Sequence, residues 1–219
     1  MSQGRSGSSL LCNLIANIVG VGRTVLASEL FGSGAGQKNA PKPGWAGFKW
    51  KPYYFDSEYG HALQWIGDKG VRIVYNFRNP LDVLMSKDKH DEVHLKGYCT
   101  KGDSRCIHKA VDLHTGPRLL QDLDALVHLM DVDMARAAEF HIPILCMNYT
   151  DVAEGSKWNQ VKALQRIADF LLGVDRQPTE KDLKVDTVST APERQKDQIK
   201  NYAEVVKTLK GIKYQQLLH

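Results

Sequence analysis

Apolar and polar positions along the chain predict short strands separated by amphipathic helices. Residues 71–77 are β-branched and aromatic and end at a polar Arg-Asn-Pro corner, which is typical of a buried strand. A helix is expected to begin at Pro80, because Asn79 is a good N-cap and proline is favoured at the first helical position. Further strands are expected at 46–50 and 144–149, and further helices at 57–67 (Ala62, Leu63 and Ile66 inward), about 117–141, about 158–172 before Gly173, and about 195–209. Helices of this length between strands favour an α/β fold, with a parallel sheet covered by helices on both faces.

The N-terminal segment has two interpretations. The apolar residues 10–22, with Arg5 before them and small residues at 25–28 after them, are similar to a signal peptide. Asn13 and Asn17 interrupt this run one helical turn apart, which favours an amphipathic helix instead. No apolar run reaches the roughly 18 residues that a membrane span needs.

Composition excludes several classes of protein. With 42% hydrophobic and 25% charged residues among 219, the chain is expected to form one globular domain over 1–219, not a disordered, collagen-like or coiled-coil structure. Its 29 basic and 25 acidic residues leave a net charge of +4. This excess is too small to indicate a nucleic-acid-binding or membrane-surface protein, although it is compatible with one anionic small ligand.

The cysteine pattern indicates no disulfide framework, because four cysteines are too few for a chain of this length. Cys99 and Cys106 lie seven residues apart in a polar segment with His94 and His108. A local disulfide, solvated loop residues and a zinc site are the alternatives. The spacing fits no ligand pattern of zinc proteins, which favours the first two, and no metal is expected.

A glycine- and serine-rich loop near the start of the chain opens directly into the first apolar helix. Glycine allows a tight turn, and the free N–H groups at the start of the helix then point toward an anion. The hydroxyls of Ser6, Ser8 and Ser9 add donors around Gly7, and Arg5 adds a fixed cation. The alternative is an ordinary N-capped helix after a turn. A Walker A loop is excluded, because no lysine follows Gly7.

A second anion-binding corner is predicted at 78–86. Arg78 follows the most strongly predicted strand, and ligands of open α/β sheets bind at this carboxyl edge. Ser86 lies eight residues further on, two turns into the following helix, so both side chains could reach one phosphate. Each residue alone could equally belong to a capped turn or an ordinary helix.

Together the two corners resemble the sulfotransferases that use 3′-phosphoadenosine 5′-phosphosulfate (PAPS). Their 5′-phosphosulfate loop, Pro-Arg/Lys-Ser-Gly-Thr/Ser-Thr/Ser, is similar to residues 4–9, and their 3′-phosphate motif, Arg-Asp/Asn-Pro-x-Asp-x-x-x-Ser, is similar to residues 78–86. Weaker similarities occur at 47–49, 167–173 and 199–205. The Arg-Ser-Gly-Ser-Ser sequence is closer to the carbohydrate and tyrosyl-protein branches than to the phenol and steroid branch.

The resemblance implies a P-loop NTPase-like fold with a parallel sheet of about four to five strands. It also implies PAPS as co-substrate and a small-molecule or glycan acceptor with a hydroxyl, a carbohydrate being mildly favoured. The residues implied to bind PAPS are Arg5, Ser6, Gly7, Ser8, Ser9, Leu10, Arg78 and Ser86.

Three residues are expected to catalyse sulfuryl transfer, an in-line displacement with charge building on the bridge oxygen. Arg5 would neutralise that charge, and Lys49, otherwise a surface lysine, would be the second cation on the transfer path. Glu29, otherwise a solvated acid, lies where the similar carbohydrate and tyrosyl-protein enzymes place a glutamate base. Lys51 stands where the phenol and steroid branch has a catalytic histidine. The alternates for the base are His61, His90 and His94.

The start of the chain differs from the family, because only three residues precede the phosphate loop where the family has a buried strand. This difference predicts a chain shortened at its N-terminus, whose activity is then in question. It also leaves two compartments open: the cytoplasm for the chain as it stands, and the Golgi lumen for a longer chain with a membrane anchor.

Two other functions stay open. A non-catalytic nucleotide-binding or interaction domain derived from this family would bind without turnover. A P-loop kinase would bind ATP and magnesium, but the sequence lacks the Walker lysine and a convincing second acidic motif. Aromatic residues at 45–55 could stack on an acceptor ring or pack in a core, and the oligomeric state is not indicated.

Overall fold

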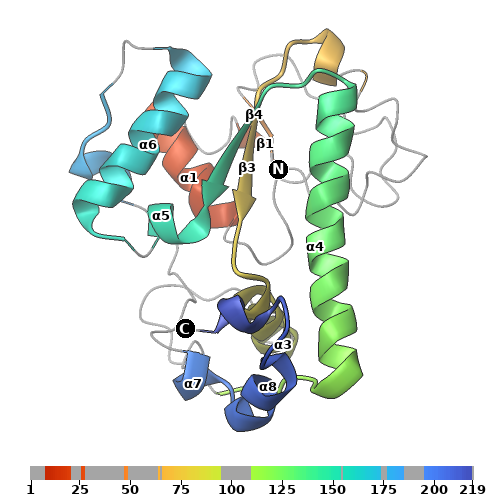
Figure 1. Ribbon diagram of the computed structural model, residues 1–219. Coiled ribbons are helices and arrows are strands. Elements are labelled where there is room, and N and C mark those ends of the chain that lie inside the picture. Colours follow the sequence, from red (N-terminus) through yellow and green to blue (C-terminus); the bar gives the residue numbers. More distant parts are fainter. Residues whose placement is uncertain are drawn as a thin grey trace. The chain divides into compact units, whose positions relative to one another are not determined.

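The computed structural model describes residues 8–20, 26–27, 47–48, 64, 66–94, 110–153, 155–173, 177–184 and 195–218. In these residues the chain is a mixed α/β protein made mostly of helices (Figure 1). The elements are α1 (Ser8–Val19), β1 (Leu26–Ala27), β2 (Gly47–Phe48), β3 (Ile73–Phe77), α3 (Pro80–His94), α4 (Gly116–Glu139), β4 (Ile144–Asn148), α5 (Tyr149–Ala153), α6 (Lys157–Leu172), η6 (Glu180–Leu183), α7 (Gln195–Gln198), α8 (Tyr202–Leu209) and η7 (Gln215–Leu217).

The chain divides into two compact units, each with its own core. The first unit contains Met1–Phe77 and Leu129–Val185, and the second contains Arg78–His128 and Asp186–His219. The boundary after Phe77 separates β3 from α3, and the boundary after His128 divides α4 between the two units.

The described strands of the first unit form two parallel pairs. β3 lies beside β4, with Ile73 opposite Ile144 and Phe77 opposite Asn148. β1 lies beside β2 in a separate pair of two residues each. The prediction of parallel pairing is therefore confirmed for these strands, and the strands of the longer pair are joined by helical segments, as parallel neighbours require.

Different helices cover the two faces of the β3–β4 pair. Val74 and Met147 belong to a core cluster with residues of α1, α5 and α6, whereas Ile73 and Tyr75 belong to another with the C-terminal half of α4 (Figure 1). Successive residues of a strand point to opposite faces of a sheet, so this alternation buries β3 on both sides. The prediction of a strand without an exposed face is confirmed for β3.

The core of the second unit joins α3, α8, the N-terminal half of α4 and the extended segment at Val111 and Leu113. Val111 forms a parallel bridge with Ile199, between α7 and α8. The buried members of this cluster are Leu81, Met85, Val111, Leu113, Leu119, Leu123, Ile199, Val205, Leu209 and Tyr214.

Several predicted boundaries are confirmed. α3 begins at Pro80, and the Asn79 side chain caps it by accepting a hydrogen bond from the Leu81 N–H at 2.9 Å. α4 and α6 agree with the predicted helices within two residues, and Gly173 ends α6 at a positive φ of 84°, where glycine is favoured. Ile66 is fully buried as expected, whereas most of the helix predicted at 57–67 lies outside the described residues.

Two predictions are wrong. Residues 195–209 do not form one helix, because the backbone on either side of Ile199 pairs with Val111 instead: the Val111 N–H donates to the Gln198 carbonyl and the Lys200 N–H to the Val111 carbonyl, each at 2.8 Å. Tyr149 is not the last residue of a strand. It begins the short helix α5, and the Asn148 side chain accepts a hydrogen bond from the Thr150 N–H at this turn.

Candidate functional site

The structure describes the predicted site residues unevenly. Arg5, Ser6, Gly7, Glu29 and Lys49 lie outside the described residues, as do Cys99, Cys106, His61 and His108. Ser8 and Ser9 form the first turn of α1, as the predicted loop-to-helix junction requires, and Leu10 is partly buried against the core of the first unit. His90 and His94 lie in α3.

Arg78 and Ser86 lie at a corner of the second unit, where the chain enters α3 immediately after β3. Asn79 fixes the start of the helix through its cap, and its side-chain amide also donates to the Leu217 carbonyl at 2.7 Å. Ser86 is on the same helix, one turn beyond Asp82, so the two side chains share a helix face. The structure thus places Arg78 directly after β3 and Ser86 on the following helix, and their binding of one phosphate stays a prediction.

The polar side chains of this corner are buried. Arg78 is 4% exposed, Asp82 5%, Ser86 6% and Gln195 1%. The described residues contain six buried polar or charged side chains, so most of them gather here. Burying a charged side chain is costly unless it is paired, so the partners of Arg78 and Asp82 decide whether this corner is stable.

The charges of the corner are balanced by one carboxylate. The Arg78 Nε lies 3.9 Å from the Asp82 Oδ2, a distance of an ion pair. The other oxygen, Asp82 Oδ1, accepts a hydrogen bond from the Gln195 amide at 2.9 Å. The arrangement holds a guanidinium out of contact with water, where charge–charge interactions are screened less than at the surface.

Sequence reasoning missed Gln195, which it treated only as the first residue of a helix. Its partner Asp82 lies 113 positions earlier in the chain. A lone glutamine at a helix start carries no pattern that distinguishes it from a surface residue, so this contact emerges only from the fold.

The two predicted phosphate motifs belong to different units. Ser8, Ser9 and Leu10 are in the first unit, and Arg78 and Ser86 are in the second. Arg78 and Ser86 thus lie in the same unit, and the start of α1 belongs to the other unit.

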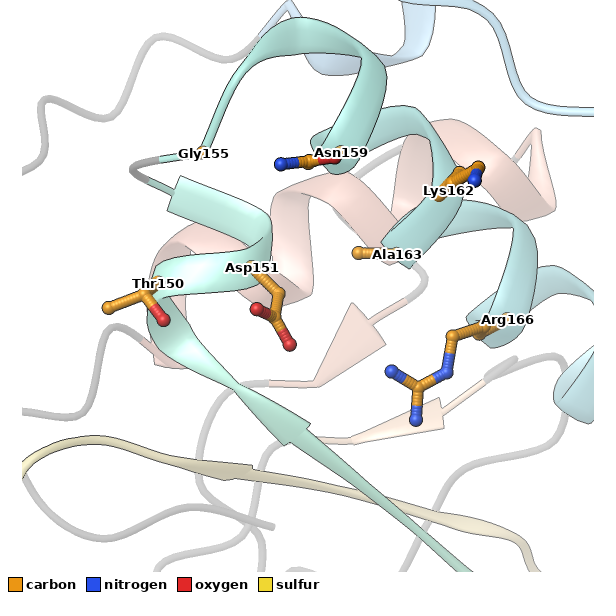
Figure 2. A pocket seen from close by; sticks show the side chains of 7 residues that line it. All are labelled: Thr150, Asp151, Gly155, Asn159, Lys162, Ala163 and Arg166. Atoms are coloured by element: carbon orange, nitrogen blue, oxygen red, sulfur yellow. The ribbon is translucent and has the colours of Figure 1, made fainter.

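A pocket of about 470 Å³ lies in the first unit, between α5 and α6, and was not predicted from the sequence (Figure 2). Asp151 of α5 and Arg166 of α6 line facing sides of it, as Figure 2 shows. The Lys162 ammonium lies 3.4 Å from the centre of the exposed Trp158 ring, a cation–π contact. The remaining lining residues are Thr150, Gly155, Asn159 and Ala163. Among the residues that the structure describes, no member of the predicted PAPS site lines this pocket.

The first unit also contains a buried acid, Asp133. The Tyr75 hydroxyl donates to Asp133 Oδ2 at 2.9 Å, while Oδ1 has no hydrogen-bond partner among the described residues. Burial raises the pKa of the Asp133 carboxyl to about 7, against a smaller lowering by the Tyr75 hydrogen bond. Burial and the neighbouring carboxyl raise the pKa of Tyr75 far above its usual value, so this hydroxyl stays a donor at any working pH.

Comparisons of the chain with protein-family models, with curated proteins and with solved structures found no match. None of the helices in the described ranges is long and apolar enough to cross a lipid bilayer. Within the same ranges, no three His, Cys, Asp or Glu side chains are grouped so as to hold a metal ion. What the fold and the site define is thus an α/β chain with a buried, charged corner at the carboxyl end of a parallel strand.

Proposed function

We propose that this chain is a sulfotransferase that moves a sulfuryl group from PAPS to an acceptor hydroxyl, with a carbohydrate as the favoured acceptor. The observation that carries the proposal is the buried corner of Arg78, Asp82 and Ser86 at the carboxyl end of β3. These residues form the part of the sequence that resembles the 3′-phosphate motif of that family, and a buried arginine in this place supports the proposal.

In this proposal Arg78 and Ser86 bind the 3′-phosphate of PAPS. The guanidinium supplies charge-assisted hydrogen bonds, and the serine hydroxyl supplies a further donor. Only 3% of the Arg78 side chain is exposed, so a phosphate reaches it through a local opening of the corner. Association is therefore expected to be slower than for a preformed open site.

The proposed architecture is a P-loop NTPase-like parallel sheet of about four to five strands. Its support is the parallel pairing of β1 with β2 and of β3 with β4, together with the helices on both faces of β3. In such sheets the ligand binds at the carboxyl ends of the strands, which is where Arg78 follows β3.

The proposed chemistry is an in-line displacement at sulfur. The loop from Arg5 to Leu10 would hold the 5′-phosphosulfate, and Glu29 would take the proton of the acceptor hydroxyl as its oxygen forms a bond to sulfur. The bond from sulfur to the bridge oxygen breaks, and its electron pair stays on the phosphate of the departing adenosine 3′,5′-bisphosphate. Arg5 and Lys49 would balance the negative charge that builds there.

A transfer assay tests this proposal. The full chain is incubated with ³⁵S-labelled PAPS and a panel of sugar, tyrosyl-peptide and phenol acceptors. We expect label on an acceptor with the wild type, loss of kcat in Glu29→Gln with binding of the bisphosphate retained, and an increased KM for PAPS in Arg78→Gln. Gln121→Leu, an exposed position on α4, is the matched control and should transfer like the wild type.

Nucleotide-binding measurements made beside this transfer assay separate the alternatives. Binding of adenosine 3′,5′-bisphosphate without transfer to any acceptor would favour a non-catalytic nucleotide-binding domain and contradict the enzyme proposal. Magnesium-dependent binding of ATP in preference to the bisphosphate would instead favour a P-loop kinase.

A further inference from the structure

Gln195 is the most deeply buried polar side chain of the corner that contains Arg78. It is 1% exposed and begins the four-residue helix α7, far from Arg78 in sequence. Its side-chain amide donates two hydrogen bonds of 2.9 Å, one to Asp82 Oδ1 and one to the Leu217 carbonyl. A primary amide has two N–H donors, so both are used here.

The first of these bonds fixes the carboxylate that faces Arg78. Asp82 Oδ2 faces the guanidinium as an ion pair at 3.9 Å, and Asp82 Oδ1 accepts the hydrogen bond from Gln195, so Gln195 holds in place the negative charge that attracts Arg78. An arginine fork recognises phosphate through its orientation as well as its charge. The direction in which Arg78 presents its N–H groups therefore depends on how Asp82 is held.

The second bond connects the corner with the end of the chain. The Leu217 carbonyl accepts from Gln195 and also from the Asn79 amide at 2.7 Å, which uses both of its lone pairs. Asn79 in turn caps α3. Asn79 and Asp82, which both follow Arg78 in the chain, are thus tied to α7 and η7 by a connected set of hydrogen bonds.

We propose that Gln195 is a positioning residue that orients Arg78, through Asp82, toward the 3′-phosphate of the nucleotide. This inference rests on the proposed function. It adds a residue from the C-terminal segment that lies outside both sequence motifs and gives that segment a role in selecting nucleotides with a 3′-phosphate. Gln195 touches Asp82 and not the ligand, so its replacement changes selectivity for the 3′-phosphate and not general nucleotide binding.

The test compares two ligands that differ only in the 3′-phosphate. Dissociation constants for adenosine 3′,5′-bisphosphate and for 5′-AMP are measured calorimetrically on the full chain, as wild type, Gln195→Leu, Arg78→Gln and the double variant. Gln195→Leu is expected to weaken binding of the bisphosphate by about tenfold and to leave binding of 5′-AMP unchanged, because the buried Asp82 carboxylate loses its hydrogen-bond donor. In the Arg78→Gln background the same replacement should have no further effect on the ratio of the two constants. Gln121→Leu serves as the control.

A conservative variant covers the case in which Gln195→Leu does not fold. Gln195→Glu keeps the shape, and above the pKa of the new carboxyl it places a second negative charge against Asp82. Protonation restores one donor, so its selectivity for the 3′-phosphate should recover toward that of the wild type between pH 8 and pH 5. Wild-type selectivity for Gln195→Glu at every pH would overturn the inference.

The outcomes separate this inference from the proposed function. Equal weakening of both ligands by Gln195→Leu means that Gln195 only supports the fold, and overturns the positioning role while the sulfotransferase proposal stands. If the wild type binds 5′-AMP as tightly as it binds the bisphosphate, the protein has no 3′-phosphate site. Both proposals are then wrong.

Discussion

Asp133 places a carboxyl group in the core of the first unit, on the part of α4 that packs against β3. Burial raises its pKa from 3.8 to about 7, so between about pH 4 and pH 7 the folded protein holds a proton that the unfolded chain has released. The unfolded state binds fewer protons in this window, and stability therefore falls as the pH rises through it. The penalty is complete above about pH 7, where the folded state must bury a carboxylate.

We expect Asp133→Asn to remove this part of the pH dependence. One pKa unit corresponds to about 1.4 kcal/mol, so the wild type should lose on the order of a few kcal/mol between pH 5 and pH 8 relative to the variant. The amide oxygen of asparagine can still accept from the Tyr75 hydroxyl, so the contact with β3 is retained. Urea unfolding at the two pH values measures the difference, and parallel changes in wild type and variant would contradict the assignment.

Single residues of the candidate site were predictable from the sequence to different degrees. Arg78 and Ser86 belong to one short motif after a strongly patterned strand, so their placement in one corner follows from local structure. Gln195 and Asp133 carry no such local signal, because each matters only through a partner that the fold brings from a distant segment. The periodicity of a single sequence does not reveal side-chain contacts between residues that are far apart in the chain.

At the scale of elements, Asn201 shows how the second unit holds its C-terminal helices. It precedes α8, but its side chain does not cap that helix. It pairs with the extended segment before α4 instead, accepting from the Leu113 N–H at 3.0 Å and donating to the Leu113 carbonyl at 2.7 Å. The side chain thus continues the backbone pairing that begins at Val111 and Ile199.

Asn201→Asp is expected to destabilise the protein by about 1–3 kcal/mol. The carboxylate can still accept from the Leu113 N–H, but it cannot donate to the Leu113 carbonyl and places a second acceptor against it. Asn159→Asp, at an exposed position in the first turn of α6 where a carboxylate is favoured by the helix dipole, is the control for the same change of charge and should lose no stability. Chemical unfolding, monitored by circular dichroism, measures the free energy of unfolding of both variants. Equal values for Asn201→Asp and the wild type would show that the pairing of Asn201 with Leu113 does not stabilise the protein.

This pairing also explains why the predicted helix at 195–209 was wrong. The segment keeps apolar residues at helical spacing, with Ile199, Val205 and Leu209 all in the core. The break occurs because the backbone at Ile199 has a competing partner in Val111, some ninety residues earlier. By contrast, β3, α4 and α6 were predictable within two residues, and so was the first residue of α3, because caps, proline and periodicity act locally.

At the scale of the whole molecule, ligand binding to the folded state alone should raise its stability. A ligand present at 100 times its Kd adds about 2.7 kcal/mol. For a chain of this length that corresponds to a rise in Tm of roughly 5–10 °C. We expect adenosine 3′,5′-bisphosphate to give such a rise in a thermal melt, and 5′-AMP at the same concentration to give less.

The whole-molecule predictions went less far than the local ones. Mixed α/β character and parallel pairing followed from helices alternating with short apolar strands. A single domain over 1–219 and a sheet of four to five strands stay predictions. Hydrophobic pattern identifies strands one at a time, whereas the order and extent of a sheet depend on contacts between segments far apart in sequence.

The most direct test of the central claim is a calorimetric titration of the full chain with adenosine 3′,5′-bisphosphate and with ATP, on wild type and on Arg78→Gln. The variant keeps an amide that can donate to Asp82 while removing the charge that would face the 3′-phosphate. We predict tight binding of the bisphosphate, weak binding of ATP, and a loss of about tenfold or more for the bisphosphate in Arg78→Gln. Binding of ATP at least as tight as that of the bisphosphate, or bisphosphate binding unchanged in Arg78→Gln, would contradict the assignment of this corner as a 3′-phosphate site.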